Sequence, residues 1–415
     1  MKFTLESLMQ TVGCAKYPDR WAEIFDTVMR DFDKNGCPLT DPAYYDRLHR
    51  QYNAFPLHLA TYKEAATAVG RSEPLSRLLA LLVASLSASE TAWEDVKAFS
   101  APKTADGSPD LATDMLTGLA ICCQIPYMHD LLTKRRLPED VILRSVQVLE
   151  KGVDQYAMRH DGIRGYDLLE WFQRNIFGHL YRIHRLEIEI FAKFSGRAKV
   201  FENDEGERIA LAHDITLHRS GWALGAKNYT DEAGSFYAEV QENETDWMGF
   251  PYDDRGFVKK TAVTLSKDKW HLVLEYGDPV VSLHIPADGR LDAESVDETL
   301  AGTKEFLRTY FPDYTYKAFY CNSWLLDPRL ATLVGPDSNI AKFGKRFAPL
   351  TAKSEGNAVF RFVFLKSDPK SVDITTLPES TRLERALKAH YLAGKCIYEV
   401  KGYFFSSEQY NGRLL

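Results

Sequence analysis

The 415-residue chain has few cysteines and no cysteine pair at metal-binding spacing. Its six cysteines form no CxxC motif, and Cys122 and Cys123 are adjacent, which argues against both a zinc knuckle and a disulfide framework. Reduced thiols and a cytoplasmic location are therefore predicted. The N-terminal residues MKFTLESLMQTVG carry one lysine and no apolar core, so they predict no secretory signal peptide.

The sequence also lacks a long apolar run and an excess of basic residues. Its longest apolar stretch, residues 75–86, is interrupted by Ser76, Arg77 and Ser85 and is too short to span a bilayer. The formal net charge of −7 offers no general basic face to a phosphate backbone. Neither a membrane nor a nucleic-acid partner is therefore predicted.

Helical periodicity dominates residues 1–178. Trp21, Ile24, Phe25, Val28 and Met29 recur at the spacing that places them along one face of a helix. A further helix is predicted over residues 166–177 and closes the region. Other segments with helical character cover residues 41–52, 56–70, 74–88, 109–124 and 138–158.

After residue 185 the apolar period changes to two, which predicts strands with one buried face. Residues 186–194 and 209–217 alternate in this way, and residues 261–265 and 270–276 predict a hairpin around a turn at 266–269. The segment 219–260 predicts an insertion of loops with a short strand. From residue 280 the chain predicts strands at 280–285, 316–326, 358–365 and 400–405, and helices at 292–310 and 381–392, the last with a Thr381–Glu384 capping box.

The segment VVSLHIPADGRLDAES, residues 280–295, joins a buried strand to a helix through a short loop. Pro286 cannot donate to a sheet ladder, so pairing is expected to fail there and to open a slot. Gly289 and Arg290 precede a helix N-terminus, whose free N–H groups suit an anion, and Arg290 adds a cation. An ordinary strand–helix connection has the same form, so the spacing alone leaves both interpretations open.

Residues 283–394 resemble the GNAT-like C-terminal domain of a family of bacterial acyltransferase-domain proteins. The family usually also carries a helical N-acyltransferase-type N-terminal domain, which residues 1–140 resemble. The resemblance implies an α+β fold: an all-helical domain at 1–140, then at 141–415 a GNAT-like mixed β-sheet flanked by helices, with an insertion near 200–278. The matching motifs are the HIP strand end with Gly289 and Leu291, YFP at 310–312, CNSWLLDPRL at 321–330, SNIAKFGKRF at 338–347, and LPESTRLERA at 377–386 with Gly394.

The resemblance implies an acyltransferase that moves an acyl group from acyl-CoA or acetyl-CoA to an amine or similar nucleophile, without a metal. The acceptor is a small molecule or a peptide that attacks directly in a ternary complex. The helical domain is expected to supply part of the acceptor pocket or a homodimer surface. The pantetheine arm is expected between the strands ending at Ile285 and near Ser323, with the diphosphate on the amides of residues 288–291. The cofactor-binding residues are then Ile285, Asp288, Gly289, Arg290, Leu291 and Asn339.

One departure from the family weakens the expectation of catalysis. The usual loop is [Q/R]xxGx[G/A], whereas PADGRL at residues 286–291 holds a single glycine. A catalytically degenerate GNAT-like binding or scaffold protein therefore stays open as the alternative.

His284 and Ser323 are the predicted catalytic residues. An imidazole at the end of this strand can accept a proton from an amine near neutral pH, although strand alternation allows His284 to face either side. Ser323 is expected near the thioester. Cys321 shares its strand face, where an acyl-cysteine or a small buried hydrophobe are the alternatives and the second is favoured.

Two other polar groups have structural interpretations. Ser338 and Asn339 suit a helix N-cap, whereas the resemblance places Asn339 at the coenzyme A arm. His179, His184 and Glu187 show no known metal-binding spacing, so no metal site is predicted.

Overall fold

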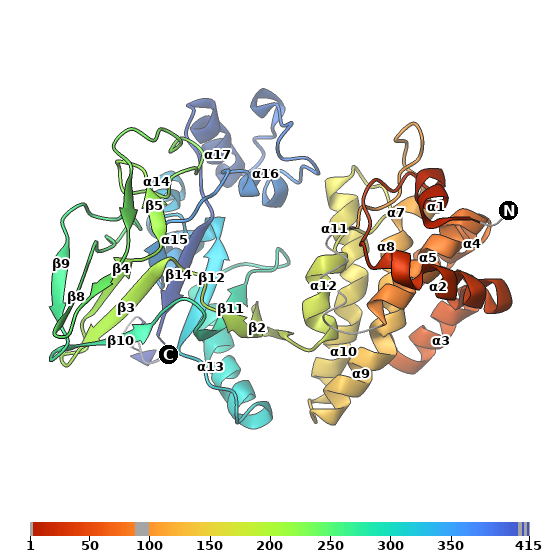
Figure 1. The fold of residues 1–415 in the computed structure, drawn as a ribbon, viewed down its shortest axis with the longest axis horizontal. Helices are drawn as coiled ribbons and strands as arrows, with labels where there is room; N and C mark the ends of the chain where they lie inside the picture. The colour runs from red at the N-terminus through yellow and green to blue at the C-terminus, as the bar shows by residue number, and fades with distance from the viewer. Residues whose placement is uncertain (1–2, 88–98, 406–408, 411–412, 415) are drawn as a thin grey trace. The chain divides into compact units, whose positions relative to one another are not determined.

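The computed structural model describes residues 3–87, 99–405, 409–410 and 413–414. The chain divides into two compact units, Met1–Tyr181 and Arg182–Leu415. Figure 1 shows a first unit built from helices and a second unit built around β-sheets, which confirms the predicted fold class. The division lies after Tyr181 rather than at the predicted residue 140, because α10 and α12 pack on the helices of the first unit.

Within the first unit, short turns separate amphipathic helices. Its elements are α1 (Leu5–Thr11), α2 (Trp21–Asn35), α3 (Pro42–Tyr52), α4 (Leu59–Gly70), α5 (Glu73–Leu86), α7 (Leu111–Asp114), α8 (Leu116–Ile121), α9 (Ile125–Lys134), α10 (Glu139–Gln147), α11 (Lys151–Arg159) and α12 (Leu169–Ile176).

Most helices predicted from periodicity are present, with two differences. The predicted helix over 109–124 is divided into α7 and α8, and the one over 138–158 into α10 and α11 with a 3-10 turn between them. Helix α9 was not predicted. Pro126 sits at its start, where the missing N–H costs nothing, so a proline here begins a helix and does not break one.

Helices α5 and α8 form the centre of the first unit. Every residue of α8 is buried, and α5 buries Leu78, Leu79 and Leu82 among others. Tyr45 and Phe55 pack on Tyr62 of α4, with ring centroids 5.8 and 4.5 Å from its ring. These apolar contacts account for a helical unit that needs no disulfide.

The ring of Tyr166 occupies a space that two glycines leave open. A Cβ on Gly152 would lie 2.2 Å from Tyr166 Cε2, and one on Gly118 would lie 2.9 Å from Tyr166 Cβ. Real Cβ atoms do not approach other atoms this closely, so both positions require glycine. The requirement comes from packing, because neither glycine has a positive φ.

We therefore expect Gly152→Ala to lower the free energy of unfolding by about 1–3 kcal/mol, the usual cost of overpacking a core. Urea denaturation followed by far-UV circular dichroism measures this loss. Gly70→Ala is the matched control, since its Cβ would meet Thr40 at an ordinary 3.4 Å and alanine favours a helix. An unchanged denaturation midpoint for Gly152→Ala would contradict the packing argument.

The second unit is organised around a six-stranded main sheet of order β1-β2-β11-β12-β14-β13. Strand β11 pairs with β12 in parallel and with β2 antiparallel, so the sheet is mixed. Its strands are β1 (Leu180–Ile183), β2 (Leu186–Lys193), β11 (Pro279–His284), β12 (Ala318–Ser323), β13 (Ala348–Leu350) and β14 (Val400–Phe404).

Helices cover one face of the main sheet, and α13 (Ala293–Tyr310) is the longest of them. Its buried residues recur every three or four positions, which gives one apolar face. The other helices of the unit are α14 (Arg329–Val334), α15 (Asn339–Gly344), α16 (Ala358–Phe362) and α17 (Arg382–Leu392). Thr381 and Glu384 form the predicted capping box of α17.

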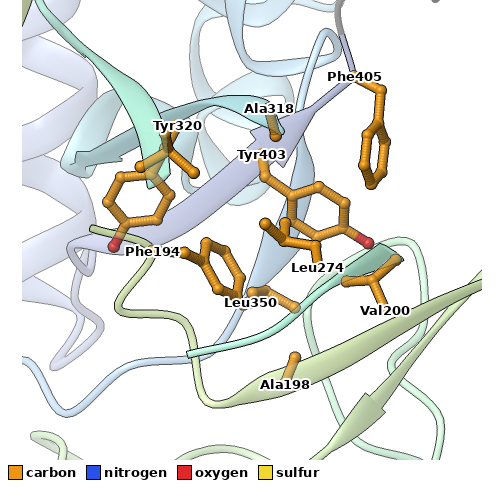
Figure 2. Close-up of a cluster of buried hydrophobic side chains, with 10 residues drawn as sticks. Phe194, Ala198, Val200, Leu274, Ala318, Tyr320, Leu350, Tyr403 and Phe405 are labelled. Atoms are coloured by element: carbon orange, nitrogen blue, oxygen red, sulfur yellow. The ribbon is translucent and has the colours of Figure 1, made fainter. Parts of the chain in front are cut away.

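A side sheet of order β10-β3-β4 packs on part of the other face. It consists of β3 (Ala198–Asn203), β4 (Arg208–Ala212) and β10 (Trp270–Leu274). Figure 2 shows Phe194, Tyr320 and Tyr403 gathered between the two sheets, with the ring of Phe194 5.5 Å from Tyr320 and 5.9 Å from Tyr403. Small two- and three-stranded sheets complete the unit. They are β5 (Ile215–Leu217) with β6 (Phe236–Ala238), then β7 (Gln241–Glu242), β8 (Asp246–Gly249) and β9 (Val263–Ser266), and the short C-terminal strands β15 (Gln409–Tyr410) and β16 (Arg413–Leu414).

Three strand predictions were wrong. The predicted hairpin at 261–276 does not form, because β9 pairs with β8 while β10 pairs with β3 in another sheet. The predicted strand at 209–217 is divided between β4 and β5, which belong to different sheets. Residues 358–365 contain helix α16 instead of a strand, since a short apolar run has the same appearance in either structure.

Strand β2 carries a β-bulge that reverses its buried face. Val280 pairs with Ala192 and Ser282 with Glu189, so β2 has one residue more than β11 over this interval. Phe191 adopts a left-handed φ of 62° at the bulge. Before the bulge Glu187 and Glu189 point away from the helices, whereas beyond it Ala192 packs on the apolar cluster on that same side.

Candidate functional site

Strands β11 and β12 separate toward their C-terminal ends. Their parallel pairing runs from Val280 opposite Ala318 to Ser282 opposite Tyr320 and then stops. Both strands nevertheless continue: β11 stays paired to β2 as far as His284, and β12 stays paired to β14 as far as Ser323. The two strands therefore diverge within the sheet, and the divergence begins before the predicted point at Ile285.

The bulge in β2 gives a physical reason for this divergence. A bulge bends its strand and increases the local twist, and it often ends regular pairing nearby. Here it lies between Ala192 and Glu189, beside the level of Val281, the middle of the β11–β12 ladder. Strand β11 follows β2 beyond that level, while β12 follows β14.

His284 lies at the end of β11 on the face away from the helices. Its Nε2 is 2.8 Å from Oε2 of Glu189, and the two side chains are 24% and 19% exposed. Glu187 is directly opposite His284 in the ladder, so Glu189 is a diagonal neighbour on the same face. The structure thus brings a histidine and a carboxylate together where the strands part.

Sequence reasoning missed Glu189. Its position in an alternating strand marked it as one of several solvent-facing acids, and only the pairing of β2 with β11 brings it to His284. The available signal was the polar face of β2, Glu187 and Glu189, but a sequence does not reveal which strand lies alongside.

The β11–α13 loop, residues 285–292, is exposed over residues 287–290, whereas Leu291 is buried. Oδ1 of Asp288 accepts a hydrogen bond from Nη2 of Arg182 at 3.0 Å. The carbonyls of Gly289 and Arg290 accept hydrogen bonds from Arg185. At the end of the loop the Asp292 carboxylate caps α13 by accepting from the Ser295 N–H, which lowers its pKa.

Ser323, the second predicted catalytic residue, has a structural role at the end of β12. Its Oγ accepts a hydrogen bond from the Leu325 N–H at 3.2 Å and caps the 3-10 turn Trp324–Leu326. Cys321 is completely buried, and burial raises the pKa of its thiol. A thiol that resists ionisation makes a poor nucleophile, in agreement with a structural role for Cys321.

The other predicted contact, Asn339, is exposed at the first position of α15. Ser338 provides the cap of this helix, since its Oγ accepts from the Ala341 N–H at 3.2 Å. Asn339 is not needed for the cap, and its side chain is on the surface.

Other polar groups lie on the same face of the main sheet as His284. Tyr320 Oη is 2.8 Å from Oγ of Ser195, and burial raises the pKa of the tyrosine. Lys401 Nζ donates to the Ser195 carbonyl at 2.7 Å, and burial, with a contribution from Arg197, lowers its pKa. The side sheet packs on the apolar residues of this face, and the cluster that they form does not include His284.

A separate pocket of about 670 Å³ lies at the β13 side of the main sheet. Leu326, Ile340 and Tyr403 contribute apolar surface, and Arg208 and Lys345 contribute charge. None of the predicted site residues lines this pocket.

Two other kinds of site are absent from the residues that the structure describes. Over residues 3–87, 99–405 and the short C-terminal strands, no group of three or more His, Cys, Asp or Glu side chains is placed to hold a metal ion. In the same residues, no helix is long and apolar enough to cross a membrane.

Comparison with known proteins links this geometry to one family. Residues 180–404 match the model of the GNAT-like C-terminal domain. An acyltransferase solved with decanoyl-CoA and teicoplanin has a TM-score of 0.58 at 19% identity, over 96% of this chain and 98% of that chain. An acyltransferase solved with decanoyl-CoA alone has a TM-score of 0.54 at 20% identity, over 87% and 86%. No curated protein matches the sequence.

Proposed function

Since the chain belongs to the family of GNAT-like C-terminal domains, we propose that it transfers an acyl group from acyl-coenzyme A to an amine or similar nucleophile. The observation that carries the proposal is the divergence of β11 and β12 after Ser282 and Tyr320, with His284 at the open end. A gap of this kind exposes unpaired backbone groups and accepts an extended ligand such as a pantetheine arm.

The loop after β11 is proposed to hold the coenzyme A diphosphate. The resemblance assigns Ile285, Asp288, Gly289, Arg290 and Leu291 to this role, and residues 287–290 are exposed as the role requires. Asn339 is exposed on α15 and is proposed as a further contact to the donor.

His284 is proposed as the general base. With Glu189 ionised, the carboxylate can only accept a hydrogen bond, so Nε2 of His284 carries the proton and Nδ1 the lone pair. The amine attacks the thioester carbonyl carbon and gives its proton to Nδ1. The new C–N bond forms, the C–S bond breaks, and the leaving thiolate takes up that proton. Glu189 stabilises the imidazolium formed in between.

The acceptor is proposed to be a small molecule or peptide that carries an amine. Glu187 and Glu189 present carboxylates beside His284, which favours an approaching cationic group. The teicoplanin complex of a similarly folded acyltransferase supports a small-molecule acceptor.

Ligand-induced stabilisation tests the donor. Acetyl-CoA or decanoyl-CoA at a concentration of about 100 times its Kd is expected to raise the free energy of unfolding by about 2.7 kcal/mol. The melting temperature Tm should then rise by about 5–10 °C. Free thiol is then measured in the presence of a panel of amines. A Tm that no acyl-CoA changes would contradict the proposal, whereas binding without thiol release would favour the scaffold alternative.

A further inference from the structure

The β11–α13 loop is held from its buried side by an arginine of the β1–β2 turn. The side chain of Arg185 is 8% exposed. Its Nε donates to the carbonyl of Arg290 at 2.6 Å, and its Nη2 donates to the carbonyls of Pro286 at 2.8 Å and Gly289 at 2.7 Å. One guanidinium thus draws together three carbonyls of the loop.

The same turn is anchored to the helix that follows the loop. The backbone N–H of Arg185 donates to Oγ1 of Thr299 on α13 at 3.0 Å. Thr299 itself is fully buried. Arg185 therefore ties the loop and the first turns of α13 to one fixed point.

These contacts determine where the loop amides point. In a trans peptide the C=O group and the next N–H group point in opposite directions, and the described peptides are all trans. Because the carbonyls of Pro286, Gly289 and Arg290 point to the buried Arg185, the N–H groups of Ala287, Arg290 and Leu291 point away from it. In the part of the chain that the structure describes, these three N–H groups donate no hydrogen bond.

Glycine flexibility does not explain this loop. Gly289, its single glycine, is not among the residues with positive φ, so its backbone conformation is open to other residues. Burying Arg185 also has a cost, because its Nη1 is buried without a hydrogen-bond partner and lies 3.8 Å from Oδ1 of Asp288. A buried guanidinium that leaves one N–H group without an acceptor needs a reason to be buried. Its hydrogen bonds to the three loop carbonyls provide that reason.

We propose that Arg185 is a positioning residue for the acyl donor: it turns the loop amides outward for the coenzyme A diphosphate in a loop that departs from the usual [Q/R]xxGx[G/A] pattern. The proposal rests on the acyl-coenzyme A function proposed above. Arg185 itself does not touch acyl-coenzyme A. It fixes the loop N–H groups in their binding orientation in advance, which lowers the conformational entropy lost on binding.

The test compares Arg185→Met with Arg185→Lys. Arg185→Met is expected to raise the Kd for coenzyme A, measured by calorimetry, and the KM for acetyl-CoA by about tenfold or more, with kcat changed less than about threefold. Arg185→Lys keeps the charge and some of the hydrogen-bond donors. Its Kd and KM are expected to lie between those of the wild type and those of Arg185→Met. The KM for acetylpantetheine, which lacks the diphosphate, should stay at its wild-type value in both variants.

Arg135→Met is the matched control, since Nη1 of Arg135 also donates to a backbone carbonyl, that of Gly178 at 2.6 Å, outside this loop. Its Kd for coenzyme A should not change. Wild-type affinity in Arg185→Met, or an equal rise in the KM for acetylpantetheine, would overturn the positioning role and leave the acyltransferase proposal intact. If wild-type protein binds no coenzyme A, both proposals fail. If Arg185→Met does not fold, Arg185→Lys decides, and an unchanged Kd there would overturn the role.

Discussion

His284→Gln is expected to lower kcat/KM for acyl transfer by about 10²–10⁴-fold, the usual contribution of a general base. Glutamine keeps a polar group that can reach Glu189, so the substitution removes the proton acceptor and preserves the local packing. Thiol release from acetyl-CoA, with the best amine of the acceptor panel, measures the loss. The Kd for coenzyme A should change little, because His284 is proposed to act on the acceptor.

Two further variants separate catalysis from structure. Glu189→Gln removes the carboxylate that lies 2.8 Å from His284 and is expected to lower kcat by about tenfold or more, as the loss of an orienting partner does. His271→Gln is the control, because His271 pairs with Asp204 at the surface, with 62% of its side chain exposed. Wild-type turnover in His284→Gln would exclude this histidine as the base.

Gly289→Trp is expected to abolish coenzyme A binding, with at least a hundredfold rise in Kd, because an indole that starts beside Arg185 would crowd the contacts that position the loop amides for the diphosphate. The fold should tolerate the change. Gly289 is exposed, and a Cβ built there would make an ordinary 3.5 Å contact with Nε of Arg185. Calorimetry with coenzyme A measures the loss, and the melting temperature checks the fold.

Ala233→Trp places the same side chain on an exposed turn of the insertion and serves as the control. It should bind coenzyme A as wild type does. If Gly289→Trp also binds normally, the diphosphate is held elsewhere and the assignment of residues 288–291 is wrong.

Local signals in the sequence predicted local structure well. The Thr381–Glu384 capping box and helix α13 were both predicted, since caps and helical periods depend on residues three or four apart. The strand that ends near His284 was also predicted, because an apolar run before Pro286 has few alternatives.

Contacts between distant segments were not predictable in this way. Glu189 reaches His284, and Arg185 reaches the β11–α13 loop, only because β2 lies beside β11. The same limit explains the error at residues 261–276. Alternation shows that a strand has a buried face, but it does not say which partner covers that face.

The bulge in β2 has a consequence for how this chain can vary. The extra residue puts Glu189 and Ala192 on the same side of the sheet, although residues three positions apart lie on opposite sides of a regular strand. Deleting Phe191 would restore an even ladder with Glu189 and Ala192 still on one side, so it would remove the bend of the strand and leave its buried faces in place. A chain shortened by this one residue should therefore keep its core and bring β11 and β12 closer together, even though Phe191 itself is 45% exposed.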